Sequence, residues 1–167
     1  FSVKNKIPLL DLHHILQSVI FHDQTLPNQR FNLTKADQMF LKQWMHTTPP
    51  ESLYPTYDTT EIWSTYCKFL LMGAEKRPIP PHIKIFNKVG DAYGFLLDIA
   101  YVMDTTNKVE FMTSAVIYCN SDGILNDSKY DYDSVGYPFY KHLGEAIYQY
   151  ELQRPKAVLP KFDTILP

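Results

Sequence analysis

The chain has 167 residues, of which 45% are hydrophobic and 20% are charged, a composition typical of a globular protein of one domain. Its formal net charge of −2 makes no basic surface for phosphates, so a nucleic acid is not an expected partner. No apolar run approaches the roughly 20 residues that a helix needs to cross a bilayer, so no transmembrane segment is expected.

Two segments in the first 50 residues have the pattern of amphipathic helices. Residues 9–21 carry apolar side chains at helical spacing, namely Leu9, Leu12, Leu16, Val19 and Ile20. After a polar loop, Thr34 and Asp37 have the spacing of a capping box that opens a second helix. Its apolar side is expected at Met39, Phe40 and Trp44. The run from Thr47 to Pro50 ends it.

A third helix is predicted after the proline-bounded loop 51–57. Asp58 and Glu61 form a second capping-box pattern. Apolar side chains follow at Ile62, Trp63, Tyr66, Phe69 and Leu70. Gly73 is placed to end this helix in the left-handed conformation. Three prolines, Pro78, Pro80 and Pro81, then make a stiff linker.

A sheet is predicted next, from strands at residues 82–88, 93–103 and 109–119. The last two are apolar at both odd and even positions, apart from Asp98. Strands of this kind are buried on both faces, so layers are expected on both sides of the sheet. Residues 104–107 form a turn, so these two strands should make an antiparallel hairpin. The fold class is therefore α/β, an antiparallel sheet with helices on both faces.

The chain is expected to close with a helix after the polar loop 120–134. Pro138 suits the first turn of a helix. One face carries Phe139, Leu143, Ala146, Ile147 and Tyr150, and it should lie against the sheet. We expect one domain over residues 1–167: a mainly helical segment at 1–77, a strand-hairpin-helix part at 82–154 and an irregular tail at 155–167.

The strongest functional signal is Lys88-Val89-Gly90, at the mouth of the first predicted strand. A glycine there lets a ligand or a backbone come close. Three runs around it carry a family resemblance: Phe86-Asn87-Lys88-Val89-Gly90-Asp91-Ala92-Tyr93-Gly94, Val109-Glu110-Phe111 and Tyr132-Asp133-Ser134-Val135-Gly136-Tyr137-Pro138-Phe139. Together with Leu33-Thr34-Lys35-Ala36-Asp37, they resemble the serine β-lactamase and penicillin-binding protein superfamily, in particular the class A β-lactamase-like serine hydrolases of the Bacteroides group.

The resemblance implies a role for four residues. Lys88 would be the lysine of the Lys-Thr-Gly motif, and its charge would favour a substrate carboxylate or the ionised nucleophile. Gly90 would leave room for substrate along the strand, and the backbone N–H of Asp91 would be one of two oxyanion-hole donors. Val89 replaces the usual Thr or Ser, which removes a hydroxyl contact to the substrate worth about 1.5–3 kcal/mol.

The resemblance also implies that the chain is incomplete, because it contains no Ser-x-x-Lys. The nucleophile would come from a missing N-terminal part, and this chain alone would be inactive. The substrate would be an acyl or peptide-like small molecule, with no metal or organic cofactor. The resemblance implies a location in the cell envelope or periplasm, or secretion. The start at Phe1 fits a fragment or a processed chain, whose signal sequence is then lost.

Other patterns are weaker. Tyr118-Cys119-Asn120 has the form of the second family motif but follows the lysine motif. The aspartates of residues 120–134 fail the EF-hand pattern and indicate a solvated loop. His13, His14, His22 and Asp23 do not share one face as metal ligands would. Ser64 and Lys68 are one residue too far apart for Ser-x-x-Lys. Cys67 and Cys119 form either one disulfide or two thiols, and the pattern favours buried thiols.

A second hypothesis is a non-catalytic α/β module. The chain has 12 Tyr and 10 Phe, and tyrosine side chains make effective contact surfaces. Such a module would bind a ligand or a protein through its tyrosine-rich surface, and Lys88 would be an ordinary strand lysine.

Overall fold

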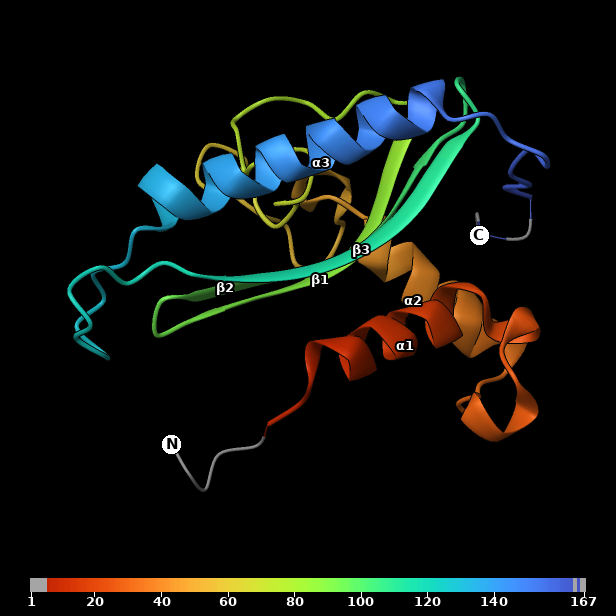
Figure 1. Ribbon diagram of the computed structural model, residues 1–167, viewed down its shortest axis with the longest axis horizontal. Coiled ribbons are helices and arrows are strands. Elements are labelled where there is room, and N and C mark those ends of the chain that lie inside the picture. The colour runs from red at the N-terminus through yellow and green to blue at the C-terminus, as the bar shows by residue number, and fades with distance from the viewer. Residues whose placement is uncertain (1–5, 164, 166–167) are drawn as a thin grey trace.

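The three strands form one antiparallel sheet in the order β1-β2-β3, with β1 at Ile83–Ala92, β2 at Phe95–Asp104 and β3 at Val109–Tyr118. The computed structural model describes residues 6–163 and 165 (Figure 1). The β2–β3 hairpin is confirmed, and β1 is longer than predicted. It pairs with β2 through a two-residue turn at Tyr93 and Gly94, which both have positive φ, as such tight hairpins require. Lys88 therefore lies in the middle of β1, opposite Ile99, and not at a strand end.

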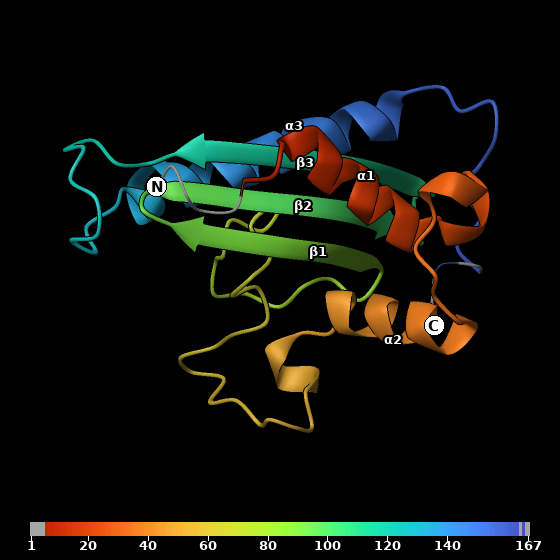
Figure 2. The ribbon, with the colours of Figure 1, turned by 90° about the horizontal axis from the view of Figure 1, so that it is seen from below.

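Helices cover both faces of the sheet, which confirms the α/β fold class. Helix α3 (Tyr137–Gln153) lies on one face, and α1 (Leu9–Ile20) crosses β2 and β3 on the other (Figures 1 and 2). Helix α2 (Lys35–His46) lies beside β1. Short helical turns complete the described elements, at His22–Gln24, Pro27–Gln29, Pro49–Glu51 and Tyr132–Gly136.

The core has two halves, one on each face of the sheet. The half under α3 contains Ile85, Leu96, Val102 and Tyr140, among others. The half under α1 uses the intervening strand positions, with Phe86, Ile99, Tyr101 and Met103 packed against Leu16 and Ile20. The two-residue period of the strands thus sends side chains to both layers, as the apolar pattern predicts.

The face of α2 that packs against the protein was predicted wrongly. The capping box of Thr34 and Asp37 is present. The buried residues of this helix, however, are Gln38 and Lys42, whereas Met39, Phe40 and Trp44 are exposed. The helix lies at the edge of the sheet, so its apolar stripe is not covered by a strand. This leaves Trp44 on an accessible surface.

Residues 59–75, called the turn segment below, form successive turns and not the predicted third helix. Their polar groups find partners elsewhere in the fold: the indole N–H of Trp63 donates to Ala74 O at 2.8 Å, and the N–H of Leu70 donates to Asp98 Oδ2 at 2.9 Å. These tertiary contacts replace helical hydrogen bonds. Gly73 has φ of +58°, so its predicted left-handed conformation is confirmed even though no helix precedes it.

Helix α3 packs with a face that only partly matches the predicted one, because Leu143 and Ile147 pack against the core as predicted. Tyr140, Gly144 and Glu151 are buried, while Phe139 and Tyr150 are exposed. A Cβ at Gly144 would lie 2.3 Å from Leu71 N, so only glycine lets the turn segment approach the helix. The contact of residues 69–72 with α3, which no sequence period encodes, determines which residues of the helix are buried.

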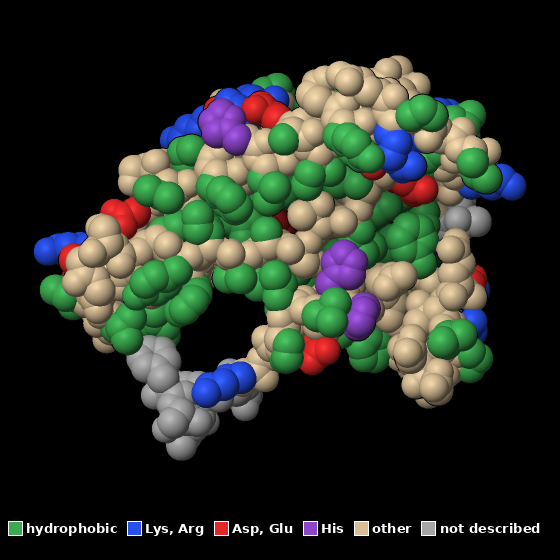
Figure 3. Space-filling view, in the orientation of Figure 1, with side chains coloured by type: hydrophobic (Ala, Val, Ile, Leu, Met, Phe, Trp, Pro, Cys, Tyr) green, Lys and Arg blue, Asp and Glu red, His purple; other side chains and the backbone are tan. Residues whose placement is uncertain are grey.

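Both outer edges of the sheet lack a paired strand within residues 6–163 and 165. The edge of β3 ends in two exposed apolar side chains, Val116 and Tyr118. Figure 3 shows hydrophobic side chains gathered along this side of the molecule, between α3 and α1. Natural proteins usually protect such an edge, and within the described residues no strand pairs with this one.

Candidate functional site

The predicted motif lies on the outer edge of β1. The carbonyl of Ile85 accepts a hydrogen bond from Lys68 Nζ at 3.0 Å, and that of Val89 accepts one from Lys88 Nζ at 2.6 Å. Both carbonyls therefore point away from β2. Because the backbone direction alternates along a strand, the N–H of Asp91 points the same way. The predicted oxyanion donor and the Lys88 ammonium thus share one side of β1.

A cavity of about 380 Å³ opens beside this edge. Its lining includes Asn87, Lys88 and Val89 from β1 and Ser64, Cys67 and Lys68 from the turn segment. The end of α2 and the following loop form the opposite wall. Of the predicted site residues, Lys88 and Val89 therefore line the cavity. Gly90 and Asp91 follow them along β1 and are not part of the lining.

Gly90 is not required by the fold. Its φ is not positive, and the nearest heavy atom to an added Cβ would be Leu97 Cδ2 at 4.0 Å. The position therefore has room for a methyl group. A glycine that neither the backbone conformation nor packing demands is consistent with space kept for a ligand.

We expect Gly90→Ala to raise the stability of the protein and to weaken its function. Alanine should raise the free energy of unfolding by up to about 0.5–1 kcal/mol, because it loses less backbone entropy than glycine in a strand. Ligand turnover or binding beside Lys88 should fall, since the new methyl group would project from the same face of the sheet as the Lys88 side chain. Chemical denaturation and an activity or binding assay on the same variant would measure both. Unchanged function would remove Gly90 from the site.

A buried polar network supports the β1 edge. The ammonium of Lys68 donates to Met45 O at 2.7 Å, to Ile85 O and to Asn87 Oδ1 at 2.7 Å. Asn87 Nδ2 in turn donates to Cys67 O at 2.8 Å and to Asp98 Oδ1 at 2.9 Å. Asn87 therefore links a buried ammonium to a buried carboxylate, and through Lys68 the network joins α2, the turn segment and the sheet.

Burial shifts the pKa of both charged members of this network. Removal from water lowers the pKa of Lys68 to about 8, and the charge of Asp98 partly offsets this effect. Burial raises the pKa of Asp98 to about 6, against the hydrogen bonds from Leu70 and Asn87. All three N–H groups of the Lys68 ammonium donate to acceptors within the protein. This geometry suits a lysine that holds neighbouring segments in place. It does not suit a base that would take a proton from Ser64.

The sequence reasoning did not predict this network. Its one visible signal was Asp98, the single carboxylate inside an otherwise apolar strand. The hydroxyl of Tyr140 also reaches this point, where it accepts from Asp98 N at 3.1 Å and lies 2.7 Å from Ala115 O. Helix α3 is thus tied to the same position of β2.

His46 ends α2 near the cavity and is expected to make stability depend on pH. Burial and the nearby charge of Lys84 lower its pKa. The unfolded chain therefore binds the His46 proton more readily than the folded chain does. The free energy of unfolding should consequently fall as the pH drops through the ordinary histidine range, below about 6.5.

Denaturation at several pH values would test this. In His46→Leu the fall should be smaller, and the exposed His142 provides the matched control, His142→Leu. An identical slope in the wild type and in His46→Leu would contradict the prediction.

The weaker patterns have structural roles or no site. Asn120 Nδ2 donates to Ile124 O at 3.0 Å within its own loop. Asp122, Asp127 and Asp131 accept backbone N–H groups in that loop. Within residues 6–163 and 165, no group of three His, Cys, Asp or Glu side chains is placed to hold a metal ion. Both cysteines are free thiols, but only Cys119 is buried, so the prediction of two buried thiols is wrong for Cys67.

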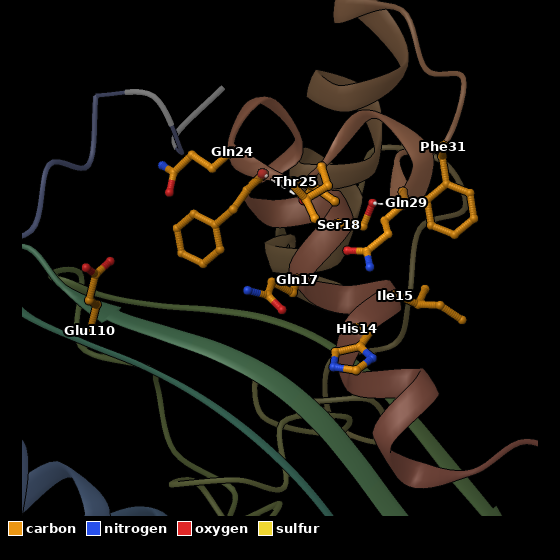
Figure 4. A pocket seen from close by; sticks show the side chains of 11 residues that line it. His14, Ile15, Gln17, Ser18, Gln24, Thr25, Gln29, Phe31 and Glu110 are labelled. Atoms are coloured by element: carbon orange, nitrogen blue, oxygen red, sulfur yellow. Dashed lines mark hydrogen bonds between the residues drawn. The ribbon is translucent and has the colours of Figure 1, made fainter.

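A larger cavity, of about 690 Å³, lies on the other side of the molecule (Figure 4). It is lined by α1, the loop that follows it and Glu110 of β3. Its surface mixes the amides of three glutamines with apolar side chains, namely Gln17, Gln24, Gln29, Ile15, Phe21, Leu26 and Phe31. Of the residues singled out in the sequence, only His14 and Glu110 line it. It shares no lining residue with the cavity at Lys88.

Comparisons with models of protein families, with curated proteins and with solved structures found no match to this chain. None of the helices in the described part of the chain is both long and apolar enough to span a membrane. The candidate site therefore rests on its own geometry and on the motif.

Proposed function

We propose that this chain is the C-terminal part of a serine hydrolase with an incomplete β-lactamase- or transpeptidase-like fold. One observation carries the proposal: Lys88 and the N–H of Asp91 lie on the same open side of β1, where Lys88 and Val89 line a cavity. This is the arrangement that acyl transfer needs, a positive charge beside a donor aimed at the developing oxyanion.

In the proposed reaction, a serine from the missing N-terminal part attacks the carbonyl of an amide or ester. The oxyanion of the tetrahedral intermediate accepts hydrogen bonds from the N–H of Asp91 and from that serine's own N–H. Lys88 provides the positive potential that favours the ionised nucleophile. The leaving group departs with a proton, and water then hydrolyses the acyl-serine ester, which frees the serine again.

The outer edge of β3 is the proposed docking place for the missing part. The edge has exposed apolar side chains at its end, Val116 and Tyr118. An added strand would satisfy the outward-facing backbone groups of β3 and cover these side chains. A location in the cell envelope is part of the same proposal.

A fluorophosphonate probe, which reacts with activated serines, tests the proposal on the natural full-length polypeptide. We expect the probe to label one serine upstream of Phe1, in a Ser-x-x-Lys sequence, and Lys88→Ala to slow labelling strongly. A full-length polypeptide that carries no such serine, or that the probe does not label, would overturn the proposal.

The non-catalytic module remains the second candidate, and the exposure of Tyr54, Tyr118 and Tyr150 favours it. Tyrosine side chains of this kind bury a large area at little entropic loss when a partner binds. Under this hypothesis Lys88→Ala leaves binding intact, whereas substitution of the exposed tyrosines weakens it.

A further inference from the structure

The cavity beside Lys88 has an aromatic wall. Trp44 comes from the last turn of α2, Tyr57 from the loop beyond it and Tyr66 from the turn segment, and all three line the cavity. Their side chains are 47%, 40% and 44% exposed, so a ligand can reach them. Tyr66 is held edge-on against Trp63, with ring centres 5.4 Å apart. The wall is thus partly fixed before anything binds.

The charged side chains that line the cavity are all positive. Its lining contains two lysines, Lys68 and Lys88, and no aspartate or glutamate. The ammonium of Lys68 is buried and has three acceptors within the protein. Lys88 is exposed and donates to Val89 O, which leaves other N–H groups of its ammonium for a ligand. The cavity therefore favours an anion at Lys88.

We propose that the aromatic wall holds the ring of an aryl-substituted carboxylate whose anionic group pairs with Lys88. The inference rests on the proposed function for the reaction that the bound molecule undergoes, and it deepens that function by naming the substrate class. A volume of about 380 Å³ lies within the range of small-molecule sites. Val89 adds an apolar side chain to the lining.

The expected gain in ligand affinity follows from the contacts between aromatic rings. A favourable pair of aromatic rings adds roughly a two- to tenfold gain in affinity beyond the area that it buries. Ligands with a ring and a carboxylate should therefore bind more tightly than ligands that have only one of the two groups. This preference is a property of binding and does not require turnover.

Cys67 provides the readout, because it is exposed and lines the cavity, whereas Cys119 is buried. The natural full-length polypeptide is treated with iodoacetamide, and alkylation of each cysteine is followed by peptide mass spectrometry. Phenylacetate should slow alkylation of Cys67 in a saturable manner. Acetate, which lacks the ring, and phenylacetamide, which lacks the charge, should each require at least about tenfold higher concentrations for the same protection.

Substitutions test the ring-binding part and the anion-binding part of the site separately. Trp44→Ala and Tyr66→Ala should weaken protection by phenylacetate by roughly two- to tenfold. Lys88→Met should remove the preference for phenylacetate over phenylacetamide. Tyr150→Ala, at an exposed tyrosine of α3 outside the cavity, is the matched control and should change nothing.

Three results would overturn the inference: no protection by phenylacetate, equal protection by acetate, or protection that survives both Trp44→Ala and Tyr66→Ala. The outcome is separable from that of the hydrolase proposal. Protection without fluorophosphonate labelling would keep the aryl carboxylate site and reject the serine hydrolase. Labelling without protection would keep the serine hydrolase and reject the aryl carboxylate site.

Discussion

Asp98→Ala is expected to lower the free energy of unfolding by about 3–5 kcal/mol, the usual effect of removing one partner from a buried charge pair. Asp98 accepts hydrogen bonds from Leu70 N and Asn87 Nδ2, and its charge compensates that of Lys68. The alanine variant leaves the ammonium buried without its counter-charge. It also releases the turn segment that forms one wall of the cavity.

Urea denaturation of the wild type and the variant measures this effect. Asp163→Ala, at an exposed aspartate, is the control and should change stability by less than about 0.5 kcal/mol. The double variant Asp98→Ala, Lys68→Met should recover part of the loss, because it removes both buried charges together. Additive effects of the two substitutions would mean that the network does not couple Asp98 to Lys68.

Under the proposed function, Lys88→Ala is expected to lower kcat/KM of the full-length polypeptide by about 100- to 1000-fold, the range for the loss of one group that stabilises charge in the transition state. The Lys88 side chain is exposed and bonds only to its neighbour's carbonyl among the contacts described. Stability should therefore change little. The activity loss and the unchanged unfolding curve together would distinguish a site residue from a structural one.

Lys84→Ala is the matched control, because Lys84 lies on the same strand but does not line the cavity beside Lys88. Its activity should remain within a few fold of the wild type. Equal losses in the two variants would indicate a general effect of charge on β1. Full activity of Lys88→Ala would favour the non-catalytic module.

The candidate site could be predicted only in part. Lys88 and Val89 were recognised as a motif, and both line the cavity. The same cavity also contains Trp44, Tyr57 and Tyr66, which come from segments far apart in the sequence. Trp44 was assigned to the buried face of its helix, because a helical period identifies a stripe but not what covers it.

The sequence by itself determined the local features of this protein. The apolar runs of β2 and β3, the turn between them and the capping box at Thr34 depend on neighbouring residues, so their patterns could be read directly. Only the tertiary structure decided the path of residues 59–75, the buried face of α3 and the pairing of Lys68, Asn87 and Asp98. These features depend on hydrogen bonds and packing between distant segments, whose free energy exceeds the small local preference for a helix.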